Sequence, residues 1–327
     1  MKKNKLSLGQ RISQLPVTSQ ILDWTKTHSF PGFRNVPIFQ VFSFLIQEAR
    51  RNDLNMRASA MTYHFFLALF PSLIFFFTLT AYLPGNLDFY KNLEHTILSI
   101  LPSGAKEYVI TDMINSIRPQ ARSGLLSIGF ILAIWFGSEG ILSLMRGFDK
   151  TYKSSFRKRN WLERQMTAIA ITFGFGILMI FSVLVIIFGE KILKQFLNYF
   201  KMNAFTKISI TSLKYAVTLI LFYSVIAIVY RYGPAIKKPI KGISPGALFA
   251  TVASIITSIL FGIFVDRFSS YHKIYGAISA LIITLIWMRL NTLILILGFE
   301  LNAAIVVNRD LMLQKSLNKR IFDSEDL

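Results

Sequence analysis

The chain has 327 residues, of which 53% are hydrophobic and only 16% are charged. A soluble domain of this length would show amphipathic periodicity, whereas this sequence repeats apolar runs of about 19 residues or more. The composition therefore indicates a polytopic membrane protein. The net charge of +19 is explained by basic cytoplasmic loops, so it gives no reason to expect a nucleic-acid partner. The absence of cysteine excludes disulfides, thiolate zinc sites and cysteine nucleophiles.

The N-terminal part is polar and divides into two segments. Residues 1–35 form a basic arm that we expect to be mostly irregular or weakly helical, and it lacks the apolar core of a cleavable signal peptide. Residues 36–57 carry apolar side chains at helical spacing opposite Gln47, Arg50 and Arg51. This segment is too short to span a bilayer, so we predict an amphipathic helix along the cytoplasmic interface.

Residues 58–307 form the membrane domain of an all-α fold, a polytopic helical bundle with six transmembrane helices. The apolar runs place the spans at about 58–83, 124–147, 165–189, 210–231, 244–266 and 276–306. Pro71 predicts a kink in the first span. The fifth span carries small residues four apart, which predict a close packing seam: Ala250, Ser254, Ser258 and Gly262. Residues 308–327 follow as a cytoplasmic tail.

Three further amphipathic stretches are predicted on the external side, at 88–101, 105–117 and 190–200. They can lie on the outer leaflet, roof a cavity or simply cap the bundle. The Lys and Arg count sets the orientation, with 24 on the side of the termini and 11 on the other. We therefore predict that both termini are cytoplasmic.

Charged residues inside the apolar spans are the candidates for function. Glu139 lies 14 residues after Leu125 in the second span, and Arg289 lies 14 residues after Tyr275 in the sixth. Each is therefore about 21 Å below the outer boundary, where an ionised group is costly and usually has a partner. We predict that they pair and line a substrate pathway with Ser138, Ser143 and Asn291. A purely structural ion pair and a snorkelling arginine are the alternatives.

A second group is predicted at the inner ends of the spans. Arg57 begins the first span, and Glu300 lies 25 residues after Tyr275 and so reaches a similar depth. We predict a contact between them, directly or through water, in an inner vestibule. Asn302 and His64 are further candidates for this vestibule. A buried neutral histidine and a titrating one both remain open for His64.

Several segments resemble the YihY/BrkB family of bacterial inner-membrane proteins. They are residues 57–73 (RASAMTYHFFLALFPSL), 136–152 (FGSEGILSLMRGFDKTY), 244–250 (SPGALFA) and 270–303, with Tyr275-Gly276, Trp287 and the GFELN sequence at 298–302. The resemblance covers roughly residues 38–306. It implies six spans, both termini inside and a bacterial cytoplasmic (inner) membrane location.

The family resemblance implies several activities without deciding among them. Members have been labelled as ribonuclease BN or as serum-resistance (virulence) factors, and transport of lipid or another amphiphile has been suggested. A metal-dependent nuclease needs clustered His and Asp ligands, but no two of the four histidines lie within thirty residues. We therefore predict no enzyme, catalytic residue, metal or cofactor. The expected function is a transporter or flippase-like protein whose partners are membrane lipids and an amphiphilic substrate. A non-transporting scaffold or envelope-integrity factor is the alternative; the sequence leaves the oligomeric state open.

Overall fold

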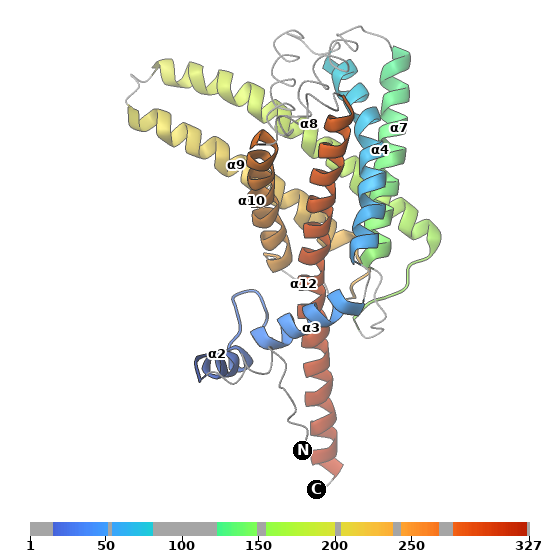
Figure 1. Ribbon diagram of the computed structural model, residues 1–327, viewed down its shortest axis with the longest axis vertical. Coiled ribbons are helices and arrows are strands. Elements are labelled where there is room, and N and C mark those ends of the chain that lie inside the picture. The colour runs from blue at the N-terminus through green and yellow to red at the C-terminus, as the bar shows by residue number, and fades with distance from the viewer. Residues whose placement is uncertain are drawn as a thin grey trace.

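The computed structural model describes residues 16–51, 54–80, 123–148, 155–199, 204–237, 243–267 and 277–325. This part of the chain is all-helical, as predicted, and its only β pairing is an isolated bridge between Phe156 and Ile236. The helices are α2 (Pro16–Thr27), α3 (Ile38–Arg51), α4 (Leu54–Thr80), α7 (Ser123–Phe148), α8 (Trp161–Tyr199), α9 (Ala204–Tyr232), α10 (Pro245–Arg267) and α12 (Ala277–Glu325) (Figure 1).

Among the described residues, five helices are long and apolar enough to cross a membrane: α4, α7, α8, α10 and α12. The apolar part of α9, Ala216–Tyr232, is shorter than a full span, so the predicted count of six is not confirmed. The predicted external stretches at 88–101 and 105–117 lie outside the described residues. Pro71 does not end α4, which continues as a helix to Thr80.

Two helices extend beyond their predicted bounds, and a third forms where mostly irregular or weakly helical structure was expected. The stretch at 190–200 was expected as a separate amphipathic helix, but residues up to Tyr199 continue α8. The predicted tail continues α12 without interruption to Glu325. Within the basic arm, residues 16–27 form α2, which begins at a proline as helices often do. In α8 and α12 no proline interrupts the extended segment, so nothing in the sequence forces the helix to end.

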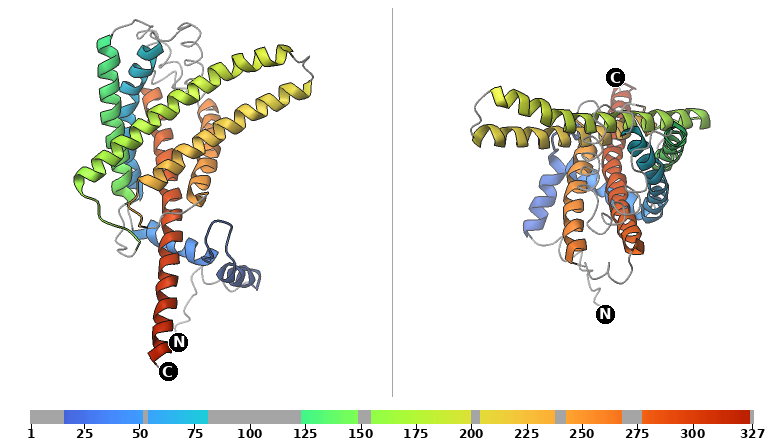
Figure 2. Two further views of the ribbon diagram at one scale, coloured as in Figure 1. Left: turned by 180° about the vertical axis from the view of Figure 1, so that it is seen from behind. Right: turned by 90° about the horizontal axis from the view of Figure 1, so that it is seen from above.

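α12 is the central axis of the molecule. It packs against α4, α10 and α3, while α4 and α7 form a closely paired layer beside it (Figures 1 and 2). α8 and α9 run side by side as a long hairpin that crosses behind these helices (Figure 2). We call the end of the bundle that holds the first residues of α4 and α10 the lower end, following Figure 1.

The core is concentrated toward the lower end. The largest fully buried hydrophobic side chains there come from α4, α7 and α12: Met61, Ile141, Leu144, Ile296, Phe299 and Ile305. α3 passes beneath α10 and across α12, and its Val41 is completely buried. The lower end is therefore the best-packed part of the described structure.

α10 and α12 cross with their backbones in contact. A Cβ atom added to Gly246 would lie 2.0 Å from the Gly298 carbonyl oxygen, and one added to Gly298 would lie 2.7 Å from the Gly246 carbonyl oxygen. The predicted small-residue seam of α10 is confirmed at Ala250 and Ser254, which are buried. It does not extend to Gly262, where an added Cβ meets nothing within 4 Å.

The loops at the lower end are joined by polar contacts. Backbone hydrogen bonds connect residues 155–157 with 235–237, and the Arg159 guanidinium donates to the carbonyl oxygens of Tyr232 and Gly233 at 3.0 and 2.8 Å. These two carbonyls lie at the C-terminal end of α9, where a cation is favourable. Ser155 Oγ donates to Asp310 Oδ2 at 2.7 Å, which ties the α7–α8 loop to α12.

Candidate functional site

The predicted contact between Arg57 and Glu300 is confirmed. Arg57 Nη1 lies 3.3 Å from Glu300 Oε1, joining the first turn of α4 to α12. Glu300 is 1% exposed and the Arg57 side chain is 18% exposed. Arg57 Nε and Nη2 are also buried and make no hydrogen bond within the described part of the chain. A carboxylate this deep needs its cation, because losing one partner leaves a charge in a low-dielectric interior.

Two threonines join α4 and α12 just above this pair. Thr62 Oγ1 and Thr292 Oγ1 lie 2.9 Å apart, and Thr292 Oγ1 also lies 3.3 Å from the Ala58 carbonyl oxygen. Both threonines are buried. They were not predicted, because a single threonine in an apolar helix ordinarily bonds within its own helix. The cross-helix contact arises from the matched depth of the two side chains.

Asn302 is also at the lower end, but it faces α10 instead of Arg57. Its Oδ1 accepts from the Gly246 backbone N–H at 2.8 Å, and its Nδ2 donates to Ser244 Oγ at 2.7 Å. Ser244 Oγ in turn accepts from the Ala247 N–H at 3.2 Å, as the N-cap of α10. Asn302 therefore fixes the start of α10. This contact was not predicted, because Asn302 was expected only as a residue of the inner vestibule.

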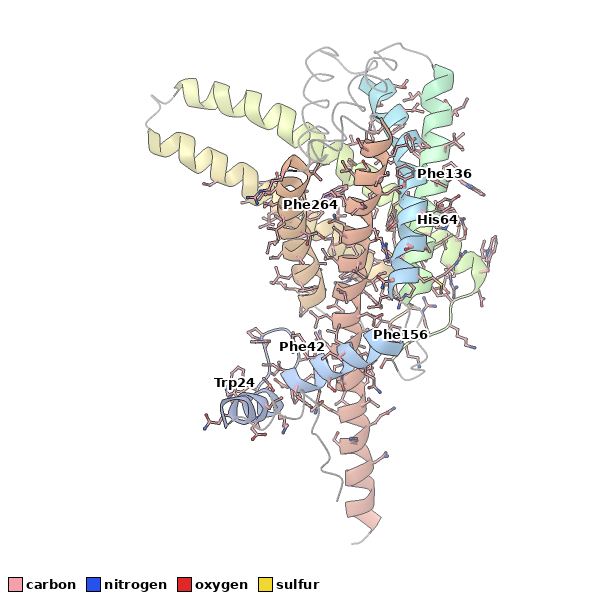
Figure 3. All side chains as sticks on the ribbon, in the orientation of Figure 1. Trp24, Phe42, His64, Phe136, Phe156 and Phe264 are labelled. Carbon is pink, nitrogen blue, oxygen red and sulfur yellow. The ribbon has the colours of Figure 1, made fainter. Side chains whose placement is uncertain are left out.

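His64 is half-buried on α4, and its ring meets that of Tyr63 edge to face at 5.4 Å (Figure 3). It lies seven residues after Arg57 on the same helix. The described contacts do not connect it with the Arg57–Glu300 pair. Its predicted participation in the vestibule remains a prediction.

The predicted ion pair between Glu139 and Arg289 is wrong. Both residues lie in the described part of the chain, yet they form no salt bridge; Glu139 is half-buried on α7 and Arg289 is exposed on α12. Residue counts did not give the direction in which each side chain faces. Trp287 Nε1 donates to Ser258 Oγ at 3.0 Å, so this side of α12 faces α10. Arg289, two residues later, is rotated by about 200° and faces away from α10.

The other predicted pathway residues bond within their own helices. Ser138 Oγ donates to the Trp135 carbonyl oxygen at 2.8 Å, and Asn291 Nδ2 donates to that of Trp287 at 2.9 Å. Ser143 is half-buried on α7. The described residues therefore do not assemble the mid-depth cluster that was expected from Glu139, Arg289, Asn291, Ser138 and Ser143.

Arg289 instead shares one face of α12 with Glu300. Spacings of three and four residues define this face, which we call the α12 strip: Ile282, Ile286, Arg289, Leu293, Ile296 and Glu300. The strip is exposed at Ile282, Ile286 and Arg289 and becomes fully buried at Ile296 and Glu300. Eleven residues separate the two charges, a rise of about 16 Å along the helix. Charge thus recurs at two depths on one surface that leads toward the lower end.

The depth of Arg289 follows from the contacts of α12 with α10. Asn302 is level with Gly246, at the start of α10, and Arg289 lies 13 residues above Asn302. This places Arg289 about 20 Å above the lower edge of a hydrocarbon core of about 30 Å, and so nearer the upper edge than the position about 21 Å below the outer boundary that the residue count predicted. An exposed arginine at this depth costs about 2.5–3.5 kcal/mol on insertion scales unless an anionic group or water accompanies it.

No three His, Cys, Asp or Glu side chains gather as a metal site within the described ranges. The expectation that the chain is not a metal-dependent ribonuclease remains a prediction.

Comparisons with known proteins converge on one family. The family model described as virulence factor BrkB matches residues 45–320. The ribonuclease-like protein YfkH of Bacillus subtilis is 29% identical over 76% of this chain and 88% of its own length. UPF0761 membrane proteins of Histophilus somni and Alteromonas mediterranea are 25% and 24% identical; the matches cover 85% and 87% of this chain and 93% and 94% of theirs. No solved structure matches.

Proposed function

The chain belongs to the virulence factor BrkB family of membrane proteins, and from this membership and its geometry we propose that it moves an amphiphile across the bilayer. The headgroup follows the exposed upper part of the α12 strip, while the acyl chains remain in the surrounding lipid. Arg289 receives an anionic headgroup, and α4 then separates from α12 so that the headgroup reaches the Arg57–Glu300 pair, because Ile296 and Glu300 are buried when the two helices are packed. The location is the bacterial cytoplasmic membrane, with the lower end in the cytoplasm.

The observation that supports this proposal most strongly is the exposure of Arg289 on a face that also carries the buried Glu300. An enclosed channel would surround its charges with protein, whereas this charge is open to the side of the bundle. Isoleucines one and two turns above Arg289 are exposed on the same face, at 46% for Ile286 and 36% for Ile282. Polar and apolar contacts on one lateral surface suit a substrate that has both parts.

A translocation assay tests the proposal. The purified protein is reconstituted into vesicles that contain a fluorescent phosphatidylglycerol, and dithionite bleaching reports the probe that reaches the outer leaflet. We expect more bleaching than in protein-free vesicles, and about a tenfold slower rate for Arg289→Gln, which removes about 1.4 kcal/mol of headgroup interaction. Arg289→Lys should retain most of the rate. Lys158→Gln, which changes an exposed cation in the α7–α8 loop, is the matched control.

The outcomes separate transport from a scaffold role. Equal rates for wild type and Arg289→Gln would contradict a path along the α12 strip. Bleaching no faster than in empty vesicles, by protein with an intact thermal transition, would favour the non-transporting alternative. The proposed topology has a separate check, because a cysteine at Lys158 should resist impermeant labels applied to intact cells.

A further inference from the structure

α3 has two apolar sides: one packs against α12, and the other is largely exposed in the described part of the chain. Ile38 and Val41 are buried beside α12, as is Phe44. Phe39, Phe42 and Ile46 form a second stripe at i, i+3 and i+7, exposed at 40%, 49% and 55%. The rings of Trp24 on α2 and Phe30 in the following loop are also exposed. α2, the loop 28–37 and α3 together, which we call the α2–α3 unit, thus present a cluster of aromatic side chains (Figure 3).

The contacts of the loop fix the level of this unit relative to the membrane. A Cβ atom on Gly32 would lie 2.9 Å from Cγ of Pro245, the first residue of the span α10. The loop therefore lies where α10 leaves the hydrocarbon core. Aromatic side chains are favoured at this interfacial level, where one end of the ring is apolar and the other is wet. The occupant that fits an apolar surface continuous with the spans is the lipid leaflet at the lower end.

The loop is held in one conformation. Gly32, Arg34 and Asn35 have positive φ angles of 91°, 54° and 62°. Phe33 and Val36 are buried at 6% and 0% exposure, and they anchor the loop in the core. A left-handed arginine is uncommon and costs free energy, so the surrounding contacts must impose it. The result is a preformed surface at the membrane interface.

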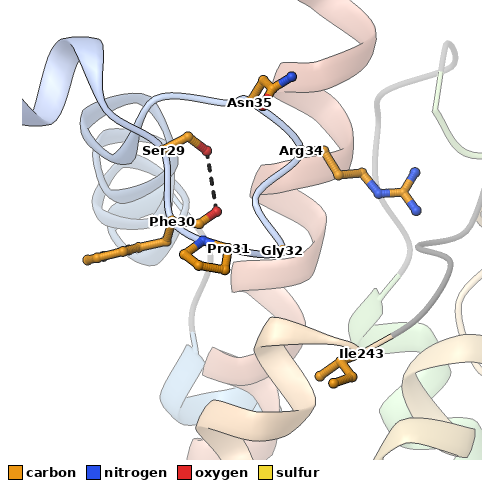
Figure 4. Close-up of a pocket in the computed structure, with 7 residues that line it drawn as sticks. All are labelled: Ser29, Phe30, Pro31, Gly32, Arg34, Asn35 and Ile243. Atoms are coloured by element: carbon orange, nitrogen blue, oxygen red, sulfur yellow. Dashed lines mark hydrogen bonds between the residues drawn. The ribbon is translucent and has the colours of Figure 1, made fainter.

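This loop borders an open hollow of about 440 Å³ beside Ile243, a volume in the range of small-ligand sites (Figure 4). Its lining includes a guanidinium and an amide together with apolar carbon: Phe30, Gly32, Arg34, Asn35 and Ile243. The Ser29 hydroxyl also lines it but donates to the Phe30 carbonyl oxygen at 3.4 Å. In Figure 4 the Arg34 side chain leaves the loop on the side opposite the Phe30 ring. Amide and guanidinium groups donate hydrogen bonds to phosphate oxygens.

We infer that the α2–α3 unit is a binding site for an anionic phospholipid of the lower leaflet. The headgroup phosphate occupies the hollow near Arg34, and the acyl chains lie along Phe39, Phe42 and Ile46. The site is separate from the α12 strip, and it does not depend on transport.

The test is the affinity of the detergent-purified full chain for dioctanoyl phosphatidylglycerol, measured by isothermal titration. Arg34→Asn removes the charge with a residue that tolerates the left-handed backbone. We expect it to weaken binding about fivefold or more, the effect of one basic residue on an anionic lipid. Arg34→Lys should bind within about twofold of wild type, because it retains the charge. Lys158→Gln, which removes a basic residue from another loop, should have no effect.

A second variant distinguishes loss of the binding site from a folding defect. Ile243 is 71% exposed, and Ile243→Trp should fill the hollow and weaken binding without disturbing the core. Unchanged affinity in both Arg34→Asn and Ile243→Trp would overturn the site. An equal loss in Lys158→Gln would also overturn it, because diffuse surface charge would then explain binding. Equally tight binding of dioctanoyl phosphatidylcholine would rule out selection of an anionic lipid. Equally tight binding of glycerol 1-phosphate would rule out a lipid occupant.

Discussion

At the scale of single residues, burial distinguishes the charges on α12. Glu300 and Arg57 are joined at 3.3 Å in the lower core, whereas Arg289 is exposed. A buried pair is weak evidence of stabilisation, since apolar residues of similar volume often replace such a pair without loss. The pair lies at the buried end of the α12 strip, so its proposed part in the path has to be separated from a structural one.

A double-mutant cycle tests this interpretation. Glu300→Leu alone strands Arg57 and should destabilise the protein by about 3–5 kcal/mol, and Arg57→Met should have a similar effect. Combining them should recover most of the unfolding free energy, measured by denaturant titration in detergent micelles. The refolded double variant should still fail to translocate lipid, which a structural pair would not predict. Additive losses in the cycle would show that the two side chains do not interact.

At the scale of elements, the crossing of α10 and α12 fixes the geometry of the lower end. Gly246→Ala directs a methyl group at the Gly298 backbone, so we expect a loss of about 1–3 kcal/mol from overpacking. Gly262→Ala is the matched control in the same helix, because its Cβ meets nothing within 4 Å. It should be neutral or stabilise by up to about 1 kcal/mol. Similar melting temperatures for the two variants would show that the crossing is not tightly packed.

The helices themselves were predictable because apolar length decides which segments span a bilayer. The ends of the helices were harder to predict, since α8 and α12 continue into polar sequence that contains no proline. The contact of Arg57 with Glu300 was predicted from depth alone. It forms because the two residues also lie on facing sides of α4 and α12. The same argument failed for Glu139 and Arg289, because residue counts give depth but not the direction a side chain faces. Rotation is set by packing, here by Trp287 on Ser258 and Gly298 on Gly246.

At the scale of the whole molecule, the described helices enclose the lower end tightly and leave the upper part of the α12 strip exposed. α8 and α9 cross the face of the bundle that is turned away in Figure 1, as a tilted hairpin (Figure 2). A substrate that needs both lipid and a polar surface would meet the strip laterally. The central claim is therefore that water and headgroups reach this face of α12 at mid-depth, in contrast to the lipid-facing side of α10.

Cysteine accessibility tests that claim most directly, because the native chain contains no cysteine. Ile286→Cys places a thiol one turn above Arg289 and leaves the arginine intact. Ile259→Cys is its control, because Trp287 bonds Ser258 and the two positions are therefore level on antiparallel helices. Both native side chains are exposed, at 46% and 58%. A charged methanethiosulfonate reagent needs a hydrated thiolate, so we predict a rate at Ile286→Cys about tenfold or more above that at Ile259→Cys. Equal rates at the two positions would contradict the account.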